Sequence, residues 1–346
     1  MIKTSHGGDI YTQNIAYDFS ANINPLGMPQ SVKTAIAENI NACEQYPDVN
    51  CTMLKKAVAE FENVGTENIV CGSGAADLIY KIVQTTAPKK ALIIAPTFSE
   101  YEKALRSFGC EIEYFYLDEK NNFELSENIL DRIFDIDLMF ICNPNNPVGN
   151  VVNSDLMNRI INKCIENNTL IVVDECFMSF VENSHKYSIK AYFDNVIILK
   201  AFTKIFAMPG LRLGYLICRN EKLCDKIENC GQCWSVSTIA QIAGIAALSE
   251  KNYIEKTFSY VKNEREFLIK NMKSLGFKVY PSKANFIFFK TDFPIDKMLL
   301  KEKIAVRKCG NYINLNDSYF RIAVRTHKEN EILISTLERI LNNGKS

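Results

Sequence analysis

The sequence predicts an α/β protein: a large domain with a mostly parallel seven-stranded sheet, and a smaller α+β domain at the C-terminal end. Short apolar runs alternate with helical patterns through the middle of the chain, which is typical of β-α-β units. Most runs are nearly continuous in apolar character, as in strands buried on both faces. The seven predicted strands are residues 68–71, 91–95, 111–117, 138–142, 170–173, 196–199 and 213–218.

The remaining elements divide the chain into three segments. Residues 1–45 contain few strand-like runs, and we expect them to pack on the small domain or to bridge the two parts. Residues 46–250 are expected to form the large domain, and residues 251–346 the small one. Two helices are predicted between strands, at 75–85 and 155–167; the small domain should contain a helix at 253–275, strands at 277–280, 285–289, 305–307 and 319–325, and a last helix from 329.

Charge and hydropathy exclude several classes of protein. Lys+Arg and Asp+Glu each total 40 in 346 residues, so the formal net charge is zero. A nucleic-acid-binding protein usually carries a basic excess, so no nucleic-acid partner is expected. No apolar stretch approaches the ~18 residues that span a bilayer, and the first residues lack the apolar core of a secretory signal. We therefore expect no membrane partner and a cytoplasmic location.

Twelve cysteines are scattered through the chain, mostly in apolar runs, where a free thiol packs as a small hydrophobe. Cys230 and Cys233 form a lone C-x-x-C pair. A structural zinc site usually needs a second such pair, and His185 and His327 show no ligand spacing. No metal is therefore expected.

Polar residues that are able to bind a ligand or take part in catalysis follow four predicted strands. Lys204 comes soon after the strand at 196–199, and Arg212 follows eight residues later behind Pro-Gly. Asn146 follows the strand at 138–142, and Asp174 ends the next one. Ser73, Gly74 and Ala75 end the first strand and open a helix, whose N-terminus suits a phosphate. Open α/β sheets bind ligands at these carboxyl ends, so the four groups should meet.

This combination resembles the fold-type I pyridoxal 5'-phosphate (PLP) enzymes of the class I and II aminotransferase group, over nearly the whole chain. The resemblance implies that Lys204 binds the PLP aldehyde covalently and later carries protons. It implies that Asp174 pairs with the pyridine nitrogen and that Asn146 donates to the ring oxygen.

The resemblance also implies how the rest of PLP is held. Ser73, Gly74 and Ala75 would bind its phosphate together with Thr203 and Arg212, and Phe98 would stack on its ring. Tyr46 would reach the PLP phosphate of a neighbouring subunit, which implies a homodimer. Ala201 stands where the family usually has Ser or Thr, so one hydroxyl contact to the phosphate is missing or replaced.

Two arginines in the C-terminal part resemble the substrate-binding residues of the family. Arg321 resembles the arginine that pairs with a substrate anion, and Arg307 resembles one that contacts a substrate phosphate. His6, Gly7 and Asn22 would bind the same phosphorylated amino acid, with Asn146 beside them. Arg325 falls on the same face of the predicted strand as Arg321 and could contribute.

Several stretches look closest to the family members that decarboxylate L-threonine O-3-phosphate in cobalamin biosynthesis. Among them are residues 5–10, 18–27 and 307–312; Phe177 also stands where ordinary aminotransferases have Tyr. The expected activity is decarboxylation of L-threonine O-3-phosphate to (R)-1-amino-2-propanol O-2-phosphate. The first alternative is an aminotransferase of a phosphorylated amine such as histidinol phosphate. The second alternative is a catalytically inactive binding protein with this fold.

Overall fold

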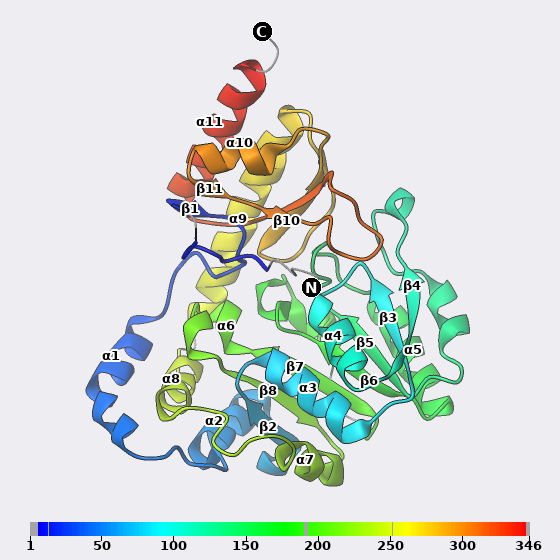
Figure 1. Ribbon diagram of the computed structural model, residues 1–346. Coiled ribbons are helices and arrows are strands. Elements are labelled where there is room, and N and C mark those ends of the chain that lie inside the picture. Colours follow the sequence, from blue (N-terminus) through cyan, green and yellow to red (C-terminus); the bar gives the residue numbers. More distant parts are fainter. Residues whose placement is uncertain (1–5, 13, 190–192, 251, 344–346) are drawn as a thin grey trace.

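The computed structural model describes residues 6–12, 14–189, 193–250 and 252–343. Seven strands of the described chain form one sheet, in the order β2-β8-β7-β6-β5-β3-β4 (Figure 1). Neighbouring strands are parallel except for β8, which is antiparallel to β2 and to β7. The predicted fold class is confirmed. The strands are β2 (Ile69–Gly72), β3 (Lys90–Ala95), β4 (Glu111–Tyr116), β5 (Leu138–Cys142), β6 (Leu170–Asp174), β7 (Val196–Ala201) and β8 (Gly214–Cys218).

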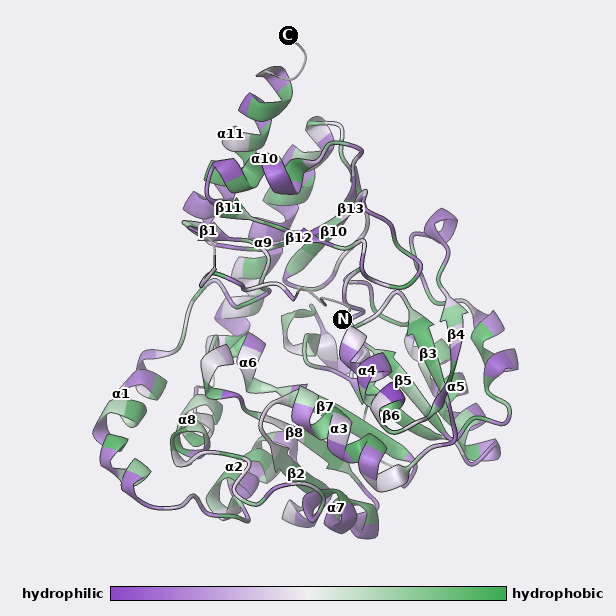
Figure 2. Cartoon of the chain, viewed as in Figure 1, coloured by the Kyte–Doolittle hydropathy of each residue, from purple (hydrophilic) through white to green (hydrophobic). Residues whose placement is uncertain are grey.

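Helices cover both faces of this sheet, which explains the continuous apolar runs. Along β5, Leu138 and Phe140 belong to the core on one face, whereas Met139 and Ile141 belong to the core on the other. Side chains alternate between faces along a strand, so a strand covered on both sides must be apolar throughout. Figure 2 shows this in the green central strands. The first face packs on α3 (Ala75–Thr86), α4 (Ser99–Ser107) and α7 (Glu221–Glu228); the second packs on α2 (Thr52–Glu62), α5 (Ser154–Glu166) and α8 (Thr238–Leu248).

Two glycines let α3 begin close to the sheet. Gly74 precedes the helix with φ of +85°, in the left-handed region where a side chain is strained. Gly214 on β8 faces the start of the helix, and a Cβ there would lie 2.8 Å from the backbone nitrogen of Ala75. The N-terminus of α3 is therefore seated at the carboxyl edge of the sheet.

The C-terminal part forms a second layer above the large sheet (Figure 1). Its antiparallel sheet has the order β12-β13-β10-β9 and packs on the long helix α9. The predicted strand 305–307 is divided, because Ile304–Ala305 pairs with β1 whereas Arg307–Lys308 pairs with β13. The elements are α9 (Tyr253–Ser274), β9 (Lys278–Val279), β10 (Phe286–Lys290), α10 (Ile295–Lys301), β11 (Ile304–Ala305), β12 (Arg307–Lys308), β13 (Tyr319–Ala323) and α11 (His327–Asn343).

The N-terminal segment contacts both parts of the molecule. β1 (Tyr17–Asp18) runs parallel to β11 in the C-terminal part. α1 (Gln30–Glu38) packs against α8, beside the large sheet. These contacts agree with a segment that packs on the small domain and bridges the two, while the exact boundaries of the three segments stay a prediction.

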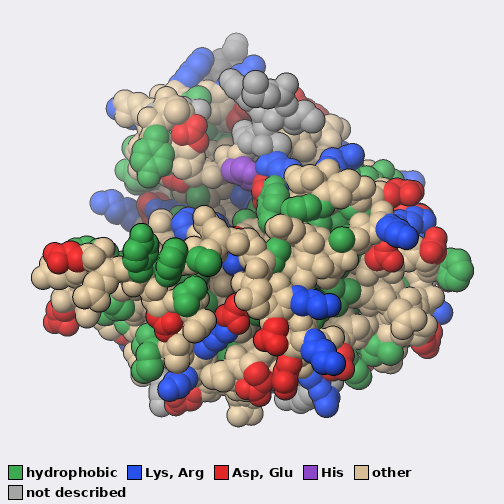
Figure 3. All heavy atoms as spheres, turned by 60° about the horizontal axis from the view of Figure 1, so that its bottom comes forward, with side chains coloured by type: hydrophobic (Ala, Val, Ile, Leu, Met, Phe, Trp, Pro, Cys, Tyr) green, Lys and Arg blue, Asp and Glu red, His purple; other side chains and the backbone are tan. Residues whose placement is uncertain are grey.

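Charges of both signs are intermingled on the face shown in Figure 3, and neither sign forms a continuous patch there. Apolar side chains gather on the side of that face where α1, α2 and α8 lie. Exposed apolar residues of this region include Ile40, Tyr46, Val49 and Met53. Among the described residues, none of the helices combines the length and the apolar character needed to cross a membrane.

Candidate active site

A cavity of about 510 Å³ lies at the carboxyl edge of the large sheet and reaches the small sheet. Most of the site residues predicted from the sequence line it, and they come from segments far apart in the chain. These are His6, Gly7, Asn22, Ala75, Phe98, Asn146, Asp174, Thr203, Lys204, Arg212, Arg307 and Arg321.

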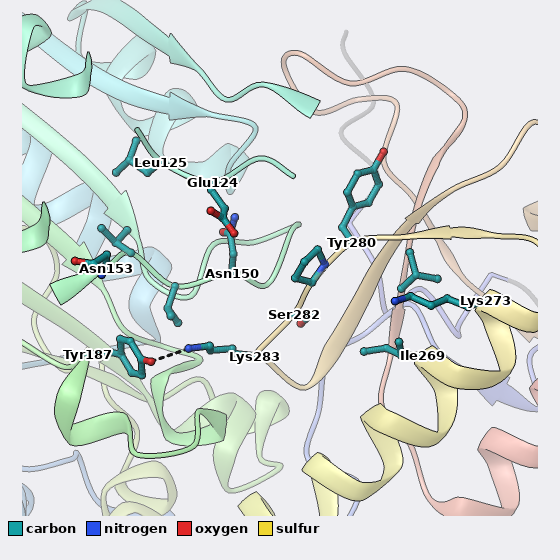
Figure 4. Close-up of a pocket in the computed structure, with 14 residues that line it drawn as sticks. Glu124, Leu125, Asn150, Asn153, Tyr187, Ile269, Lys273, Tyr280, Ser282 and Lys283 are labelled. Atoms are coloured by element: carbon teal, nitrogen blue, oxygen red, sulfur yellow. Dashed lines mark hydrogen bonds between the residues drawn. The ribbon is translucent and has the colours of Figure 1, made fainter. Parts of the chain in front are cut away.

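A second cavity, of about 540 Å³, opens on another part of the boundary between the two layers (Figure 4). Its walls include Leu125, Ile269 and Val279, and the Lys283 amine donates a hydrogen bond of 2.7 Å to the Tyr187 hydroxyl. It contains none of the predicted residues. Volume alone does not mark an active site, so convergent titratable groups make the smaller cavity the better candidate.

Lys204 is the potential nucleophile of this cavity. It lies on the short helix α6 (Phe202–Ile205), directly after β7, and its side chain reaches the cavity. Burial lowers the pKa of Lys204 to about 8, and the nearby guanidinium groups of Arg321 and Arg212 act in the same direction. An amine with this pKa is partly uncharged near neutral pH, as a nucleophile requires.

Asp174 ends β6 and is buried beside the cavity. Its carboxylate accepts a hydrogen bond of 2.6 Å from the Tyr101 hydroxyl and one of 2.9 Å from the backbone nitrogen of Cys176. Burial, and then the neighbouring carboxylate, raise the pKa of Tyr101 well above its ordinary value, so this hydroxyl stays a donor. A buried carboxylate held in this way suits a cationic ligand group.

Ala75, Thr203 and Arg212 line the cavity at the N-terminus of α3, and we call this group the cradle. A helix N-terminus beside a guanidinium is suited to an anion. A Cβ at Gly74 would lie 2.7 Å from Nη2 of Arg212, so the glycine leaves room for the guanidinium. The backbone N–H groups of Ser73 and Gly74 depart from the expectation. Ser73 donates to Asp77 and Gly74 to the carbonyl of Gly72, so both amides already have acceptors.

Arg307 and Arg321 face each other across β12 and β13, where they form a register pair, and both are buried. Arg321 donates from Nη1 to Oδ1 of Asn146 and from Nη2 to the carbonyl of Ser20, the latter at 2.9 Å. Its Nε is buried without a partner among the described residues. Two guanidinium groups that line one cavity are suited to a ligand with two anionic groups.

The cavity is also lined by two charged residues that the sequence analysis missed, Glu100 and Lys103. Glu100 contacts the His6 ring at 3.0 Å and the Lys103 amine at 2.5 Å. Hydrogen bonding from His6, and then from Lys103, outweighs burial and lowers the pKa of Glu100 to about 2. Their three-residue spacing at the start of α4 places both on one helix face, a signal that could have found them.

Asn22 and Phe177 also line the cavity. Oδ1 of Asn22 is buried with no partner among the described residues, so an acceptor is available for a ligand. Phe177 packs edge-on against Phe286, and it offers no hydroxyl. Ala201 likewise lines the cavity without a hydroxyl.

Tyr46 and Arg325 lie away from the cavity. Tyr46 is 79% exposed and stacks on Trp234 with ring centroids 4.6 Å apart. Arg325 stands two residues beyond Ala323, the last residue of β13, and its guanidinium binds Glu329 at 2.8 Å. The suggestion that Arg325 joins Arg321 is wrong, because the alternation of faces ends with the strand.

Comparisons with known proteins agree with this geometry. The family model described as aminotransferase class I and II matches residues 14–337. The threonine-phosphate decarboxylase of Salmonella typhimurium is 33% identical, over 99% of this chain and 98% of the relative. The solved histidinol-phosphate aminotransferase of Clostridium acetobutylicum is 34% identical, with a TM-score of 0.88 over 94% of this chain and 99% of that one. A histidinol-phosphate aminotransferase of Sinorhizobium meliloti, solved in complex with pyridoxal-5'-phosphate, has a TM-score of 0.86 at 20% identity, over 95% of this chain and 92% of that one.

Proposed function

The chain belongs to the aminotransferase class I and II family, and from this premise we propose that it is a PLP-dependent decarboxylase of L-threonine O-3-phosphate. The product would be (R)-1-amino-2-propanol O-2-phosphate. The observation that carries the proposal is the pair Arg307 and Arg321, buried opposite each other in the cavity that Lys204 enters.

The described residues fit PLP. The cradle of Ala75, Thr203 and Arg212 matches its phosphate, and the buried Asp174 carboxylate matches its pyridinium nitrogen. Lys204 offers the amine for its aldehyde. When bound, PLP supplies an electron-accepting ring that withdraws the electron pair of the Cα bond being broken.

The residues of the chain then determine which bond breaks. The two arginines would hold the substrate carboxylate and phosphate, and His6 would assist from the N-terminal segment. Fixing both anionic ends orients the bond from Cα to the carboxylate. Asp174 would keep its negative charge beside the ring nitrogen. Lys204 would deliver a proton to Cα after carbon dioxide has left.

An aminotransferase acting on histidinol phosphate is the alternative, supported by the Clostridium acetobutylicum structure. L-Threonine O-3-phosphate has both a phosphate and a carboxylate, so it would use both arginines. Histidinol phosphate has a phosphate and no carboxylate and would use one, whereas the two carboxylates of its co-substrate 2-oxoglutarate would again use both. Phe177, which lacks the hydroxyl that ordinary aminotransferases place there, also favours the decarboxylase.

The substrate is tested by incubating the PLP-loaded protein with L-threonine O-3-phosphate and measuring released carbon dioxide. Histidinol phosphate with 2-oxoglutarate is the parallel reaction, measured as glutamate formed. We expect carbon dioxide to dominate. Glutamate formation without carbon dioxide would assign the aminotransferase, and neither product, together with no covalent attachment of PLP, would assign the inactive binding protein.

The pKa of Lys204 leads to a pH prediction. An amine attacks the PLP aldehyde only when it is unprotonated. Because the pKa of Lys204 is about 8, its protonated form prevails below about pH 8. The rate at which added PLP becomes covalently attached to the PLP-free protein should rise roughly tenfold from pH 7 to pH 9 and then level off. Stopped-flow absorbance of PLP measures this rate. A rate that keeps rising to pH 10.5 would mean that Lys204 titrates like a solvated lysine.

We also propose a homodimer in which Tyr46 reaches the PLP phosphate of the partner. Its exposure beside the apolar surface of α1, α2 and α8 supports this role, because a residue that serves another subunit must be accessible in the single chain.

A further inference from the structure

Glu119 joins the two layers of the molecule through hydrogen bonds from four side chains. It begins the short helix η3 (Glu119–Asn121), which follows β4 of the large sheet. Its carboxylate accepts from the Lys278 amine at 2.7 Å, the Tyr280 hydroxyl at 2.6 Å, the Lys290 amine at 3.0 Å and the Tyr319 hydroxyl at 2.7 Å. All four donors belong to the small sheet or to the residue after β9. In Figure 4 the hydroxyl of Tyr280 points away from Tyr187 and Lys283, on the far side of the second cavity.

The carboxylate is charged and well satisfied. Burial by itself raises the pKa of Glu119, but the hydrogen bonds from Lys278, Tyr280, Tyr319 and Lys290 outweigh it and hold the pKa far below its ordinary value. Charge-assisted hydrogen bonds of this kind are stronger than neutral ones. One side chain of the large part therefore binds three strands of the small sheet at once.

Packing around Glu119 reinforces the same contact. Phe123, in the same loop, is buried and meets the rings of Tyr280, Phe288 and Tyr319 edge-on, at centroid distances of 5.2, 5.6 and 5.9 Å. Edge-to-face contacts are a favourable arrangement of aromatic rings. The loop from 119 to 123 therefore seats against the small sheet by charge and by packing.

Strand β13 connects this contact to the active site. Tyr319 stands two residues before Arg321, so both side chains leave the strand on the same face. Arg321 pairs in register with Arg307 on β12. A shift of β13 relative to the large sheet would move both guanidinium groups relative to Lys204.

We infer that Glu119 is a positioning residue for substrate binding: it holds β13 at the large sheet so that Arg321 reaches the cavity. The inference rests on the proposed function only in that Arg321 binds a substrate anion. Loss of the contact lowers the fraction of molecules with Arg321 in place, and the apparent dissociation constant rises in proportion.

The test compares Glu119→Gln with Glu113→Gln in the PLP-loaded protein. Glu113 is a matched control, because it stands on neighbouring β4 and pairs with Lys90 at 2.6 Å and Arg132 at 3.1 Å, both outside the small sheet. Tyr319→Phe is a milder second variant that removes one donor and keeps the ring. Two quantities are measured: hydrogen exchange of peptides covering 319–323, and the dissociation constants of L-threonine O-3-phosphate, from the absorbance change that precedes turnover, and of 2-oxoglutarate.

For Glu119→Gln we expect faster exchange in 319–323 and an affinity about tenfold weaker for whichever anion the unmodified protein binds, as when the competent fraction falls to roughly a tenth. Tyr319→Phe should change both in the same direction but less, and Glu113→Gln should change neither. Unchanged exchange and affinity in both test variants would overturn the inference, as would equal changes in Glu113→Gln. Failure of the unmodified protein to bind L-threonine O-3-phosphate would count against the proposed substrate alone, because exchange and 2-oxoglutarate binding still test Glu119.

Discussion

Replacing Lys204 with alanine is expected to lower turnover of L-threonine O-3-phosphate by at least about 10⁴-fold. The substitution removes both the amine that would attach PLP and the group that would return a proton to Cα, and loss of a positioned acid–base group alone typically costs about 10²- to 10⁴-fold. The effect on folding should be small, because the Lys204 side chain lines the cavity. The measurement is carbon dioxide release under saturating substrate.

Binding of PLP by Lys204→Ala serves as a control for the integrity of the site. The cradle of Ala75, Thr203 and Arg212 and the carboxylate of Asp174 are unchanged, so the variant should still bind PLP, without covalent attachment. Its absorbance after dialysis and its melting temperature show whether the fold and the site survive. Turnover within tenfold of the unmodified protein would contradict the role assigned to Lys204.

Replacing Arg321 with alanine should raise KM and lower kcat, with a combined loss in kcat/KM of roughly 10²- to 10³-fold. Truncating one member of a buried hydrogen-bonded charge pair typically costs about 2–5 kcal/mol. Here the loss would also leave Asn146 and the carbonyl of Ser20 without their donor. Arg321→Lys should recover only part of the loss. The ammonium group keeps the positive charge but lacks the planar, two-pronged geometry of a guanidinium.

Arg325→Ala is the matched control for Arg321. Arg325 lies four residues later, and its guanidinium binds Glu329 outside the cavity. Steady-state kinetics should change by less than about twofold, in keeping with the small contribution of a partly exposed ion pair. Equal losses in both variants would indicate a general disturbance of the small sheet instead of a lost anion contact.

Local sequence was sufficient for the strands of the large sheet and for the residues at their carboxyl ends. Most of these strands are recognisable because both faces are buried, which forces an apolar residue at nearly every position. Lys204, Asp174 and Asn146 follow directly, since parallel strands end at one edge of a sheet. The roles of these residues stay predictions until they are tested.

Where the structure departs from the expectation, the sequence did not reveal which group each residue pairs with. The run at 305–307 looks like one strand, but its two halves pair with β1 and with β13. Ser73 and Gly74 stand at a helix N-terminus, yet their amides donate to Asp77 and Gly72. Arg325 has the right spacing from Arg321, but the strand ends before it.

The pattern of apolar and polar residues along the chain thus determined the large sheet and the reactive side chains at its carboxyl edge, because these depend on periodicity and on strand direction. Only the folded chain decided which distant side chains meet: Glu100 and Lys103 beside His6, and Glu119 against three strands of the small sheet. Such contacts join residues up to 200 positions apart, as Glu119 and Tyr319 do, and each depends on the complementary charge or shape of a partner that no local pattern records.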